Sequence, residues 1–328
     1  MKELSIIIPQ YKETEEQIKP LLEILNMQEN VNFDDFEVVI VNDCSDYVLD
    51  SLFLRQFDKL NLRLLRTPKN VGSGLCRQYG VDHTYSKWIL FIDADDMIFS
   101  VLTISKILNI IKNNSDYDII RGNFLEEIVH DNTSEHSYKI NDGITWVHSK
   151  VYKREALDKY GVRFPKGIRV NEDSYFNGVV FNLHLKEFKV DDIFTIWRAN
   201  PNSLTRTAGR KLYLTGYPDF IKSKSMMIDK LKEIVSRETY LYMVAQTMYF
   251  FYFNSQDKVW NKYQDENILK LIDELILEFY DKYKEDFLSM DTEWLDEIYQ
   301  NTRVKHFSEA KIRERETFED YIFRIKSV

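Results

Sequence analysis

The sequence predicts an α/β protein: a mostly parallel sheet flanked by helices, followed by a helical C-terminal domain. Short apolar runs of strand length recur over residues 1–207, and amphipathic segments of helical spacing separate them. Strand-like runs stop near residue 209, and long, charged, amphipathic segments follow. We therefore expect two domains, residues 1–207 and 208–328.

The expected strands of the N-terminal domain are buried apolar runs over residues 4–8, 36–41, 62–65, 88–92 and 117–121. Helices are expected over residues 14–25, which open with the capping-box spacing of Thr14 and Gln17, then over 49–57, after the loop 70–74, and over 101–112. Strands and helices thus alternate, as parallel strands joined by right-handed crossovers require.

Past Gly122 the pattern is less regular. We expect a polar, loop-like segment over residues 131–142, with the end of a hairpin as the alternative, helices over 146–157 and 174–185, and a strand within 187–197. In the C-terminal domain, residues 240–253 should form a central buried helix, and residues 268–283 another. Aromatic side chains are so dense over 240–253 that we expect part of this helix to form a subunit interface in a homo-oligomer.

The composition narrows the classes of protein. The 328 residues are 44 % hydrophobic and 30 % charged, as in globular proteins. The net charge of −9 argues against general nucleic-acid binding through a basic surface. No apolar run reaches membrane-spanning length, the N-terminus lacks a signal-peptide pattern, and the two cysteines lack metal or redox spacing. We expect a cytoplasmic protein without a transmembrane segment, either free or held at the inner face of the membrane.

The central stretch of the chain is residues 88–96, in which five apolar residues are followed by Asp93, Asp95 and Asp96. Three carboxylates crowded at the carboxyl end of a buried strand repel one another, and a divalent cation would offset that repulsion. The alternative is that Asp93 caps the next helix and the other two carboxylates are solvated.

Polar residues also follow the other expected strands. Because parallel strands end at one edge of a sheet, these groups should converge on one ligand. They are Pro9, Gln10 and Tyr11 after the first strand, Asp43 after the second, and Asn70, Gly72 and Arg77 after the third. An aromatic ring, a carboxylate and a guanidinium suit the base, ribose and phosphates of a nucleotide diphosphate, and further carboxylates could hold Mg²⁺ or Mn²⁺.

These motifs, in this order, resemble those of family 2 glycosyltransferases. The matching strings are residues 5–11 (SIIIPQY), 41–46 (VNDCSD), 70–77 (NVGSGLCR), 91–96 (FIDADD), 171–173 (NED) and 197–205 (WRANPNSLT). The resemblance covers residues 1–207 and implies the Rossmann-like GT-A fold. It also implies inverting transfer of a sugar from a nucleotide diphosphate, with UDP favoured, to a glycan, glycoprotein or cell-surface polymer. Two positions depart from the family pattern: Asn42, where Asp is frequent, and Gln10, where Val is common.

The resemblance also implies roles for individual residues. A donor-nucleotide site would comprise Pro9, Tyr11, Asp43, Asn70, Gly72, Arg77 and Asp93. Asp95 would ligate Mn²⁺ or Mg²⁺, and Asp96 would assist it or cap the next helix. Asp173 would be the catalytic base, with Glu172 as the second candidate. Helix capping for Asp173, and a salt bridge or cap for Glu172, remain open alternatives.

Four further residues are candidates for the donor-sugar or acceptor pocket. Trp146 and His148 resemble positions that line it, although a histidine on a helix can equally be a packed or surface residue. Arg198 or Arg206 could pair with the diphosphate or serve a structural role. The C-terminal helices match no motif, and we expect them to shape the acceptor site or an oligomer contact.

Two other functions remain open at this point. A non-catalytic scaffold could keep the fold and bind only a nucleotide or a sugar. A sugar nucleotidyltransferase would also use paired carboxylates, but it should carry a glycine-rich basic loop where residues 9–11 stand.

Overall fold

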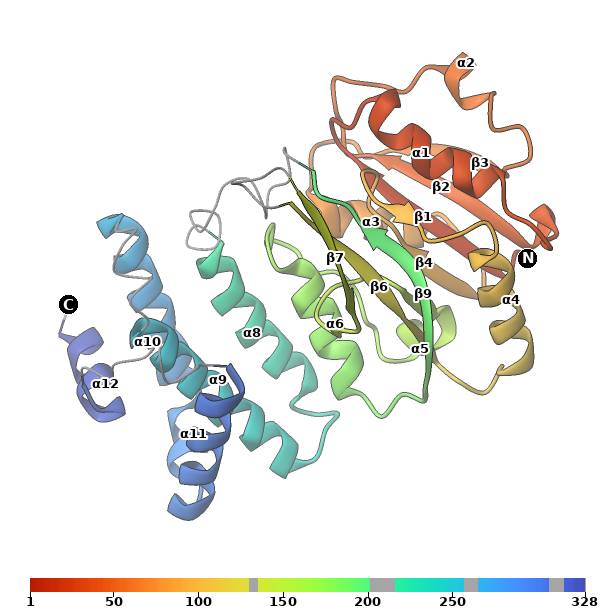
Figure 1. Ribbon diagram of the computed structural model, residues 1–328. Coiled ribbons are helices and arrows are strands. Elements are labelled where there is room, and N and C mark those ends of the chain that lie inside the picture. The colour runs from red at the N-terminus through yellow and green to blue at the C-terminus, as the bar shows by residue number, and fades with distance from the viewer. Residues whose placement is uncertain (130–134, 201–215, 257–264, 307–315, 328) are drawn as a thin grey trace. The chain divides into compact units, whose positions relative to one another are not determined.

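Figure 1 shows a computed structural model of the chain, which describes residues 1–129, 135–200, 216–256, 265–306 and 316–327. The chain divides into two compact units, Met1–Arg206 and Thr207–Val328. The first is an α/β unit and the second is helical.

The first unit is built on one sheet with the strand order β3-β2-β1-β4-β8-β6-β9-β5, and β7 pairs with β6. The strands are β1 (Leu4–Gln10), β2 (Phe36–Asn42), β3 (Leu62–Arg66), β4 (Trp88–Phe91), β5 (Met97–Ile98), β6 (Ile119–Val129), β7 (His136–Asn141), β8 (Lys150–Lys153) and β9 (Glu187–Trp197). β3, β2, β1 and β4 run parallel, β8 is antiparallel to β4 and β6, and β9 is parallel to β6. The predicted α/β class is thus confirmed for the first unit, and the predicted parallel pairing holds for the half of the sheet formed by β3, β2, β1 and β4.

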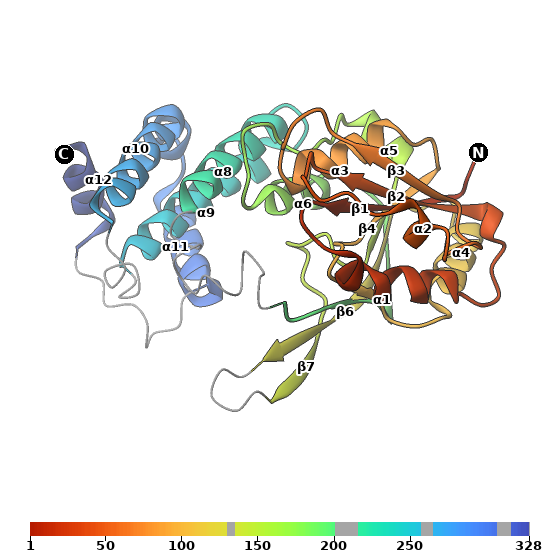
Figure 2. The ribbon, with the colours of Figure 1, turned by 90° about the horizontal axis from the view of Figure 1, so that it is seen from above.

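The helices of this unit flank the sheet (Figures 1 and 2). They are α1 (Glu15–Asn26), α2 (Ser51–Leu54), α3 (Ser73–Asp82), α4 (Thr103–Asn113), α5 (Arg154–Lys159) and α6 (Glu172–Asn182). The predicted capping box of α1 is present: the Thr14 side chain accepts from the N3 backbone, and Gln17 Oε1 accepts from the Thr14 N–H at 2.9 Å.

The buried strands explain why the polar motifs meet. Every residue of β1 and of β2 is buried, because the apolar runs face packed helices on both sides of the sheet. The parallel register aligns Gln10 with Asn42 and Asn42 with Arg66. The segments that follow these three strands therefore start at one edge of the sheet.

Residues 146–157 do not form the predicted helix. Residues 142–149 are irregular, β8 follows, and α5 begins only at Arg154. The buried residues Val151 and Tyr152 pair with both β4 and β6, so cross-strand packing overrides the local helical pattern.

Two other segments differ in extent from the expected elements. The polar segment over 131–142 contains β7, which pairs antiparallel with the outer half of an 11-residue β6, in line with the hairpin alternative (Figure 2). The predicted helix over 49–57 is a single turn, α2, in which only Phe53 is buried. Both segments lack the long apolar pattern that would have indicated their true bounds.

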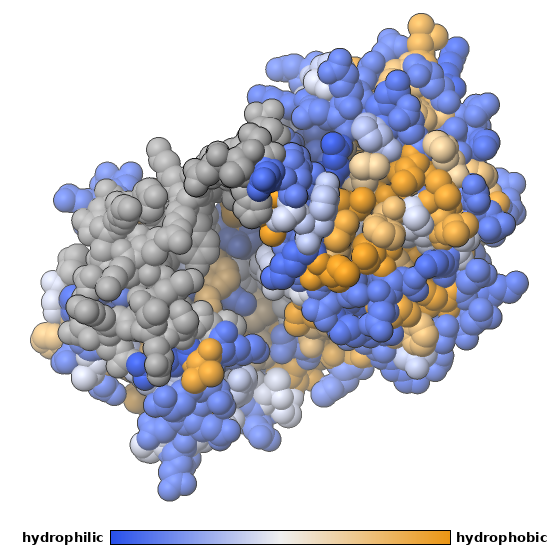
Figure 3. All heavy atoms as spheres, viewed as in Figure 1, coloured by the Kyte–Doolittle hydropathy of each residue, from blue (hydrophilic) through white to orange (hydrophobic). Residues whose placement is uncertain are grey.

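The surface of the first unit is largely hydrophilic on the face seen in Figure 3, with an apolar area in the region of β5 and β9. Phe99, directly after β5, is 41 % exposed. Within the described ranges of the chain, none of the helices combines the length and apolar character needed to cross a lipid bilayer.

The second unit consists of helices α8 (Tyr217–Leu231), α9 (Arg237–Gln256), α10 (Glu266–Leu288), α11 (Thr292–His306) and α12 (Phe318–Lys326). As predicted, α9 is its central helix, and α8, α10, α11 and α12 all contact it. The α9 rings Tyr240, Phe251, Tyr252 and Phe253 are at most 1 % exposed. These rings fill the core of their own unit, and a subunit interface formed by another part of 240–253 stays a prediction.

Candidate functional site

Asp43 organises the loop between β3 and α3. Its buried carboxylate accepts hydrogen bonds from the backbone N–H groups of Val71 and Gly72, both at 2.8 Å, and from the Thr67 hydroxyl at 3.0 Å. Gly72 adopts a φ of +86°, a conformation that favours glycine. The Asn70 side chain donates to the Asp43 carbonyl at 3.4 Å. The predicted nucleotide residues of this region are thus joined in one structure.

Replacing Asp43 by asparagine is expected to lower the free energy of unfolding by about 2 kcal/mol, because an amide nitrogen cannot accept from the loop N–H groups. Urea denaturation measures the change. Asp46→Asn, at an exposed carboxylate of the same turn, is the matched control and should change stability by less than about 0.5 kcal/mol. Equal effects in the two variants would contradict a specific role for Asp43.

Arg77 of α3 is buried and links two carboxylates. Its Nη2 donates to Asp93 Oδ1, directly after β4, and its Nη1 donates to Glu172 Oε1 of α6 at 3.0 Å. Burial alone would lower the pKa of Arg77, but the charges of Asp93 and Glu172 raise it above its ordinary value. Arg77 is 3 % exposed and joins the two carboxylates, and its predicted role in the base pocket stays a prediction.

Glu172 has the salt-bridge role that the sequence left open. Besides its pair with Arg77, its Oε1 accepts from the Ser73 hydroxyl at 2.5 Å. Helices α3 and α6 approach so closely that a Cβ at Gly74 would overlap the Glu172 side chain. The glycine-rich motif thus brings Arg77 and Glu172 together.

Asp173 lies in the first turn of α6 but does not cap it. The N-cap residue is Asn171, which has a left-handed backbone with a φ of 67°. The Asp173 carboxylate accepts from the Ser174 N–H at 2.7 Å. Burial raises the pKa of Asp173 to about 7, and the charge of Glu172 adds to this rise. A carboxyl group with such a pKa can take up and release a proton near neutral pH.

Asp93 and Asp95 form an acidic edge beside this network. Burial raises the pKa of Asp95, and the charge of Asp93 raises it further, against a hydrogen bond from the Asn200 side chain at 2.6 Å. Burial alone would raise the pKa of Asp93, but the Arg77 guanidinium holds it below its ordinary value. Burial and the charges of Asp95 and Asp93 also raise the pKa of Glu13, so Glu13 belongs to the same electrostatic region.

A divalent cation fits this edge only if phosphate oxygens and water complete its coordination. Across the described parts of the chain, no three His, Cys, Asp or Glu side chains are grouped to hold a metal ion. Mg²⁺ and Mn²⁺ commonly take one or two carboxylates together with phosphate oxygens and water. Asp95 with Asp93 supplies such a partial set: burial raises the pKa of Asp95 most, and the charge of Asp93 adds a repulsion that a cation would offset.

The Asp96 carboxylate, which was predicted to assist the metal ligand Asp95, contacts other parts of the protein. It is 4 % exposed, and its Oδ1 accepts from the Arg198 N–H at 3.0 Å. Its Oδ2 lies 3.6 Å from His148 Nε2. Asp96 therefore ties the end of β9 to the loop that precedes β8.

That loop carries the predicted pocket residues Trp146 and His148. The His148 ring packs edge-on against Trp197 at 5.1 Å, and the ring of Trp146 lies 5.5 Å from the same tryptophan. Ser149 follows with a φ of 55°, a conformation that is costly for a residue other than glycine. The loop is thus a strained segment packed on the end of β9.

The remaining predicted site residues differ in accessibility. Pro9 is buried within β1, which continues to Gln10, and Tyr11 is 42 % exposed directly after it. Arg206 lies outside the described residues. Motif reasoning gave no role to four residues that support the site from within, although two of them lie inside the quoted strings: Glu13, Thr67, Ser73 and Asn200. Glu13 lies two residues after Tyr11, a position that could have drawn attention to it.

Comparison with known proteins gives a consistent result. Residues 5–165 match the family model described as glycosyl transferase family 2. An uncharacterized glycosyltransferase of Haemophilus influenzae is 30 % identical over 152 residues, which are 46 % of this chain and 45 % of that protein. The poly(ribitol-phosphate) beta-N-acetylglucosaminyltransferase TarS of Staphylococcus aureus is 27 % identical over 186 residues, 54 % of this chain and 32 % of that protein. The chain thus matches less than half the length of each relative.

A solved structure shares the fold over the whole chain. The crystal structure of Staphylococcus aureus TarS 1–349 in complex with UDP-GlcNAc superposes with a TM-score of 0.70 and 18 % sequence identity. The match covers 100 % of this chain and 91 % of that one, so it includes the C-terminal helices.

Proposed function

Residues 5–165 of the chain belong to glycosyl transferase family 2, and from this we propose that the protein transfers a sugar from a UDP-sugar to a hydroxyl group of a cell-surface polymer. UDP is favoured because the neighbouring fold was solved with UDP-GlcNAc. A polymer acceptor is favoured over a glycoprotein because the characterised relative acts on poly(ribitol-phosphate). The proposal rests on the GT-A fold and on the glycosyltransferase family. The identities of the donor and the acceptor are its more specific part.

The observation that carries the mechanism is the poised carboxyl group of Asp173. With its pKa raised to about 7, Asp173 can accept the proton of an acceptor hydroxyl as that oxygen attacks the anomeric carbon. The bond from the anomeric carbon to the diphosphate breaks on the opposite face, so one displacement inverts the centre and an α-linked donor yields a β-linked product. Arg77 and Glu172 hold Asp173's helix in register with Asp93.

Asp95, with Asp93 beside it, is the pair that would hold Mg²⁺ or Mn²⁺ on the donor diphosphate. Such an ion supplies Lewis-acid neutralisation of the charge on the departing diphosphate. Asp96 is left to fix the Arg198 backbone and the His148 loop, so Asp95 rather than Asp96 is the proposed ligand. Asp43 and Asn70 shape the loop that would contact the nucleotide.

Isothermal titration of UDP, GDP and dTDP tests the donor site. We expect UDP to bind more tightly with Mn²⁺ than without it, and Asp95→Asn to weaken binding about tenfold only when Mn²⁺ is present, since each tenfold change is about 1.4 kcal/mol. Asp58→Asn, at an exposed carboxylate, is the control and should bind as the wild type does. If no nucleotide binds to the folded wild type with Mn²⁺, the donor-site proposal fails.

The C-terminal unit is proposed to shape the acceptor site. The match to the solved fold includes this unit, which supports a role for it in the same enzyme. NMR of the product formed from an α-linked UDP-sugar decides the stereochemistry: retention of the α-configuration would contradict the single displacement.

A further inference from the structure

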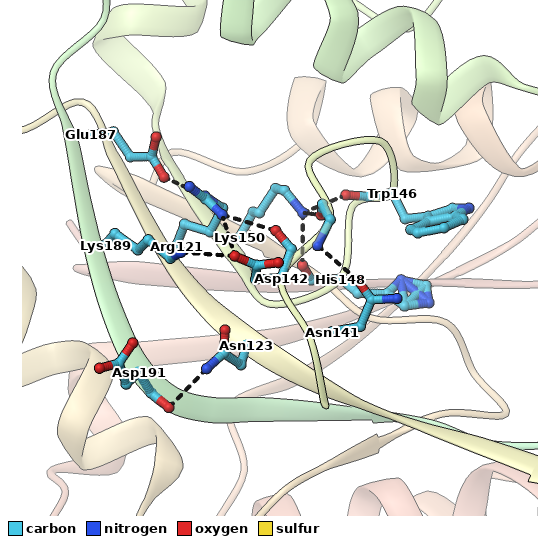
Figure 4. A network of polar contacts seen from close by, with 11 residues as sticks. Arg121, Asn123, Asn141, Asp142, Trp146, His148, Lys150, Glu187, Lys189 and Asp191 are labelled. Carbon is cyan, nitrogen blue, oxygen red and sulfur yellow. Dashed lines mark hydrogen bonds and ion pairs between the residues drawn. The ribbon is translucent and has the colours of Figure 1, made fainter. Parts of the chain in front are cut away.

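Lys150, the first residue of β8, has a buried side chain with an unusual set of partners. It is 1 % exposed, and its Nζ donates to three backbone carbonyl oxygens (Figure 4). These belong to Gly143 at 2.9 Å, Trp146 at 2.7 Å and His148 at 3.1 Å. Because an ammonium group has three N–H donors, these carbonyls use its full capacity. Within the described ranges, no carboxylate forms an ion pair with it.

The three carbonyls belong to one loop, residues 142–149. Carbonyl oxygens that converge on one point repel one another, so this conformation depends on a donor at its centre. Asn177 of α6 gives a second support, since its side-chain nitrogen donates to the Thr145 carbonyl at 3.0 Å. The inner acceptors of the loop are thereby fixed, and its orientation relative to α6 is set.

The strained residue at the end of this loop adds to its dependence on support. Ser149, with its φ of 55°, is held by Thr195 of β9, whose N–H donates to the Ser149 hydroxyl at 3.1 Å. The Ser149 carbonyl accepts from the Gly122 N–H at 3.0 Å. The two ends of the loop are thus fixed by Lys150 from within and by β6 and β9 from the side.

The position of Lys150 is electrostatically unfavourable in itself. Its cross-strand neighbour is Arg121, a like charge that is paired with Glu187. Burial and the charge of Arg121 together lower the pKa of Lys150 to about 7, against the weaker opposing charges of Asp173, Glu187 and Asp142. A buried cation in this setting must have its donors satisfied, and only the loop carbonyls do so among the described residues.

We propose that Lys150 is a positioning residue for sugar transfer: it holds the loop of residues 142–149 so that Trp146 and His148 stand at the reacting sugar, beside Asp96 and Trp197. The inference rests on the proposed function and extends it to a side chain that does not touch the substrate. The nucleotide end of the site, at Asp43 and Asp95, shares no hydrogen bond with Lys150.

Lys150→Met tests the inference, because methionine keeps the apolar stem and removes all three donors. We expect turnover of the UDP-sugar to fall at least tenfold while UDP binding by titration changes less than twofold. Lys150→Gln, which keeps two N–H donors without the charge, should fall between methionine and the wild type, and it serves as the second variant if Lys150→Met does not fold. Lys153→Met is the matched control: it lies on the same strand and donates to the Ser115 carbonyl at 2.8 Å.

Hydrogen exchange followed by mass spectrometry gives a readout that needs no turnover. Amides of residues 142–149 should exchange at least tenfold faster in Lys150→Met than in the wild type. In Lys153→Met their exchange rates should equal those of the wild type. Unchanged loop exchange, or equal losses of turnover in Lys150→Met and Lys153→Met, would overturn the inference. A wild type that binds no UDP would instead remove the proposed function, and the exchange result would still decide whether Lys150 holds the loop.

Discussion

Asp173→Asn is expected to reduce turnover of the UDP-sugar by about 10²–10⁴-fold, because asparagine cannot accept the acceptor proton. UDP binding should remain within twofold of the wild type, since the nucleotide motifs lie on the β1, β2 and β3 segments. Release of UDP with and without a polyol-phosphate polymer measures the rate. Asp191→Asn is the control, because the exposed Asp191 carboxylate forms no side-chain hydrogen bond or ion pair among the described residues, and its backbone carbonyl, which accepts from Asn123, is unchanged.

The pH profile of the wild-type enzyme should show the titration of Asp173. With the pKa of Asp173 at about 7, kcat/KM should fall tenfold per pH unit below about pH 7, where the base is protonated. Glu172→Gln removes the neighbouring charge that raises this pKa, so the acid limb should move to lower pH. A limb that stays in place in Glu172→Gln would assign it to another group.

The stability of Asp173→Asn tests the raised pKa of Asp173 independently of activity. A carboxyl whose folded pKa is raised above its unfolded value destabilises the folded state as pH rises from about 4 to about 7. The neutral asparagine avoids this cost, so the variant should melt higher than the wild type at pH 8, and the difference should shrink toward pH 4. A variant that melts lower at pH 8 would show that Asp173 stabilises the fold.

Arg77→Met is expected to lower the free energy of unfolding by about 3–5 kcal/mol, because it leaves two partly buried carboxylates without their cation. The folded fraction that remains should have little activity. Its acid limb should lie above pH 7, since the charge of Arg77 lowers the pKa of Asp173 in the wild type. Guanidinium denaturation and the pH profile of the purified variant measure the two effects.

Arg163→Met is the matched control for that variant. Arg163 pairs with Asp158 at 2.6 Å, but both side chains are more than 40 % exposed, so the loss should be below about 1 kcal/mol. A cost for Arg77→Met as small as this would mean that the buried network is not needed for the fold.

The sequence predicted the regular parts of the first unit because their signals are local. The runs of β1 and β2 are apolar along their whole length, and β9 spans residues 187–197 as expected. The loop before β8 was misread as a helix, because its conformation depends on contacts with β4, β6 and a buried lysine that no window of sequence contains. The same reasoning applies to β7, whose polar residues pair with β6 rather than pack in a core.

For the site, the sequence identified residue types but not their partners. The motifs pointed to Asp43, Arg77, Asp93 and Asp173, but they did not show that Arg77 joins Asp93 to Glu172. The Arg77–Glu172 pair joins positions 95 residues apart, and periodicity and spacing carry no information about such a pair. The assignment of roles to these residues stays a prediction until the variants above are measured.

The strand order has a consequence for how the molecule is assembled. β1, β2, β3 and β4 all lie before residue 92, so this half of the sheet can form while the chain is still being made. The pairing of β8 with β4, and the packing of α6 on α3, need segments about twice as far along the chain. A growing chain would therefore carry the proposed nucleotide-binding segments after β1, β2 and β3 before it carries Asp173, the proposed base.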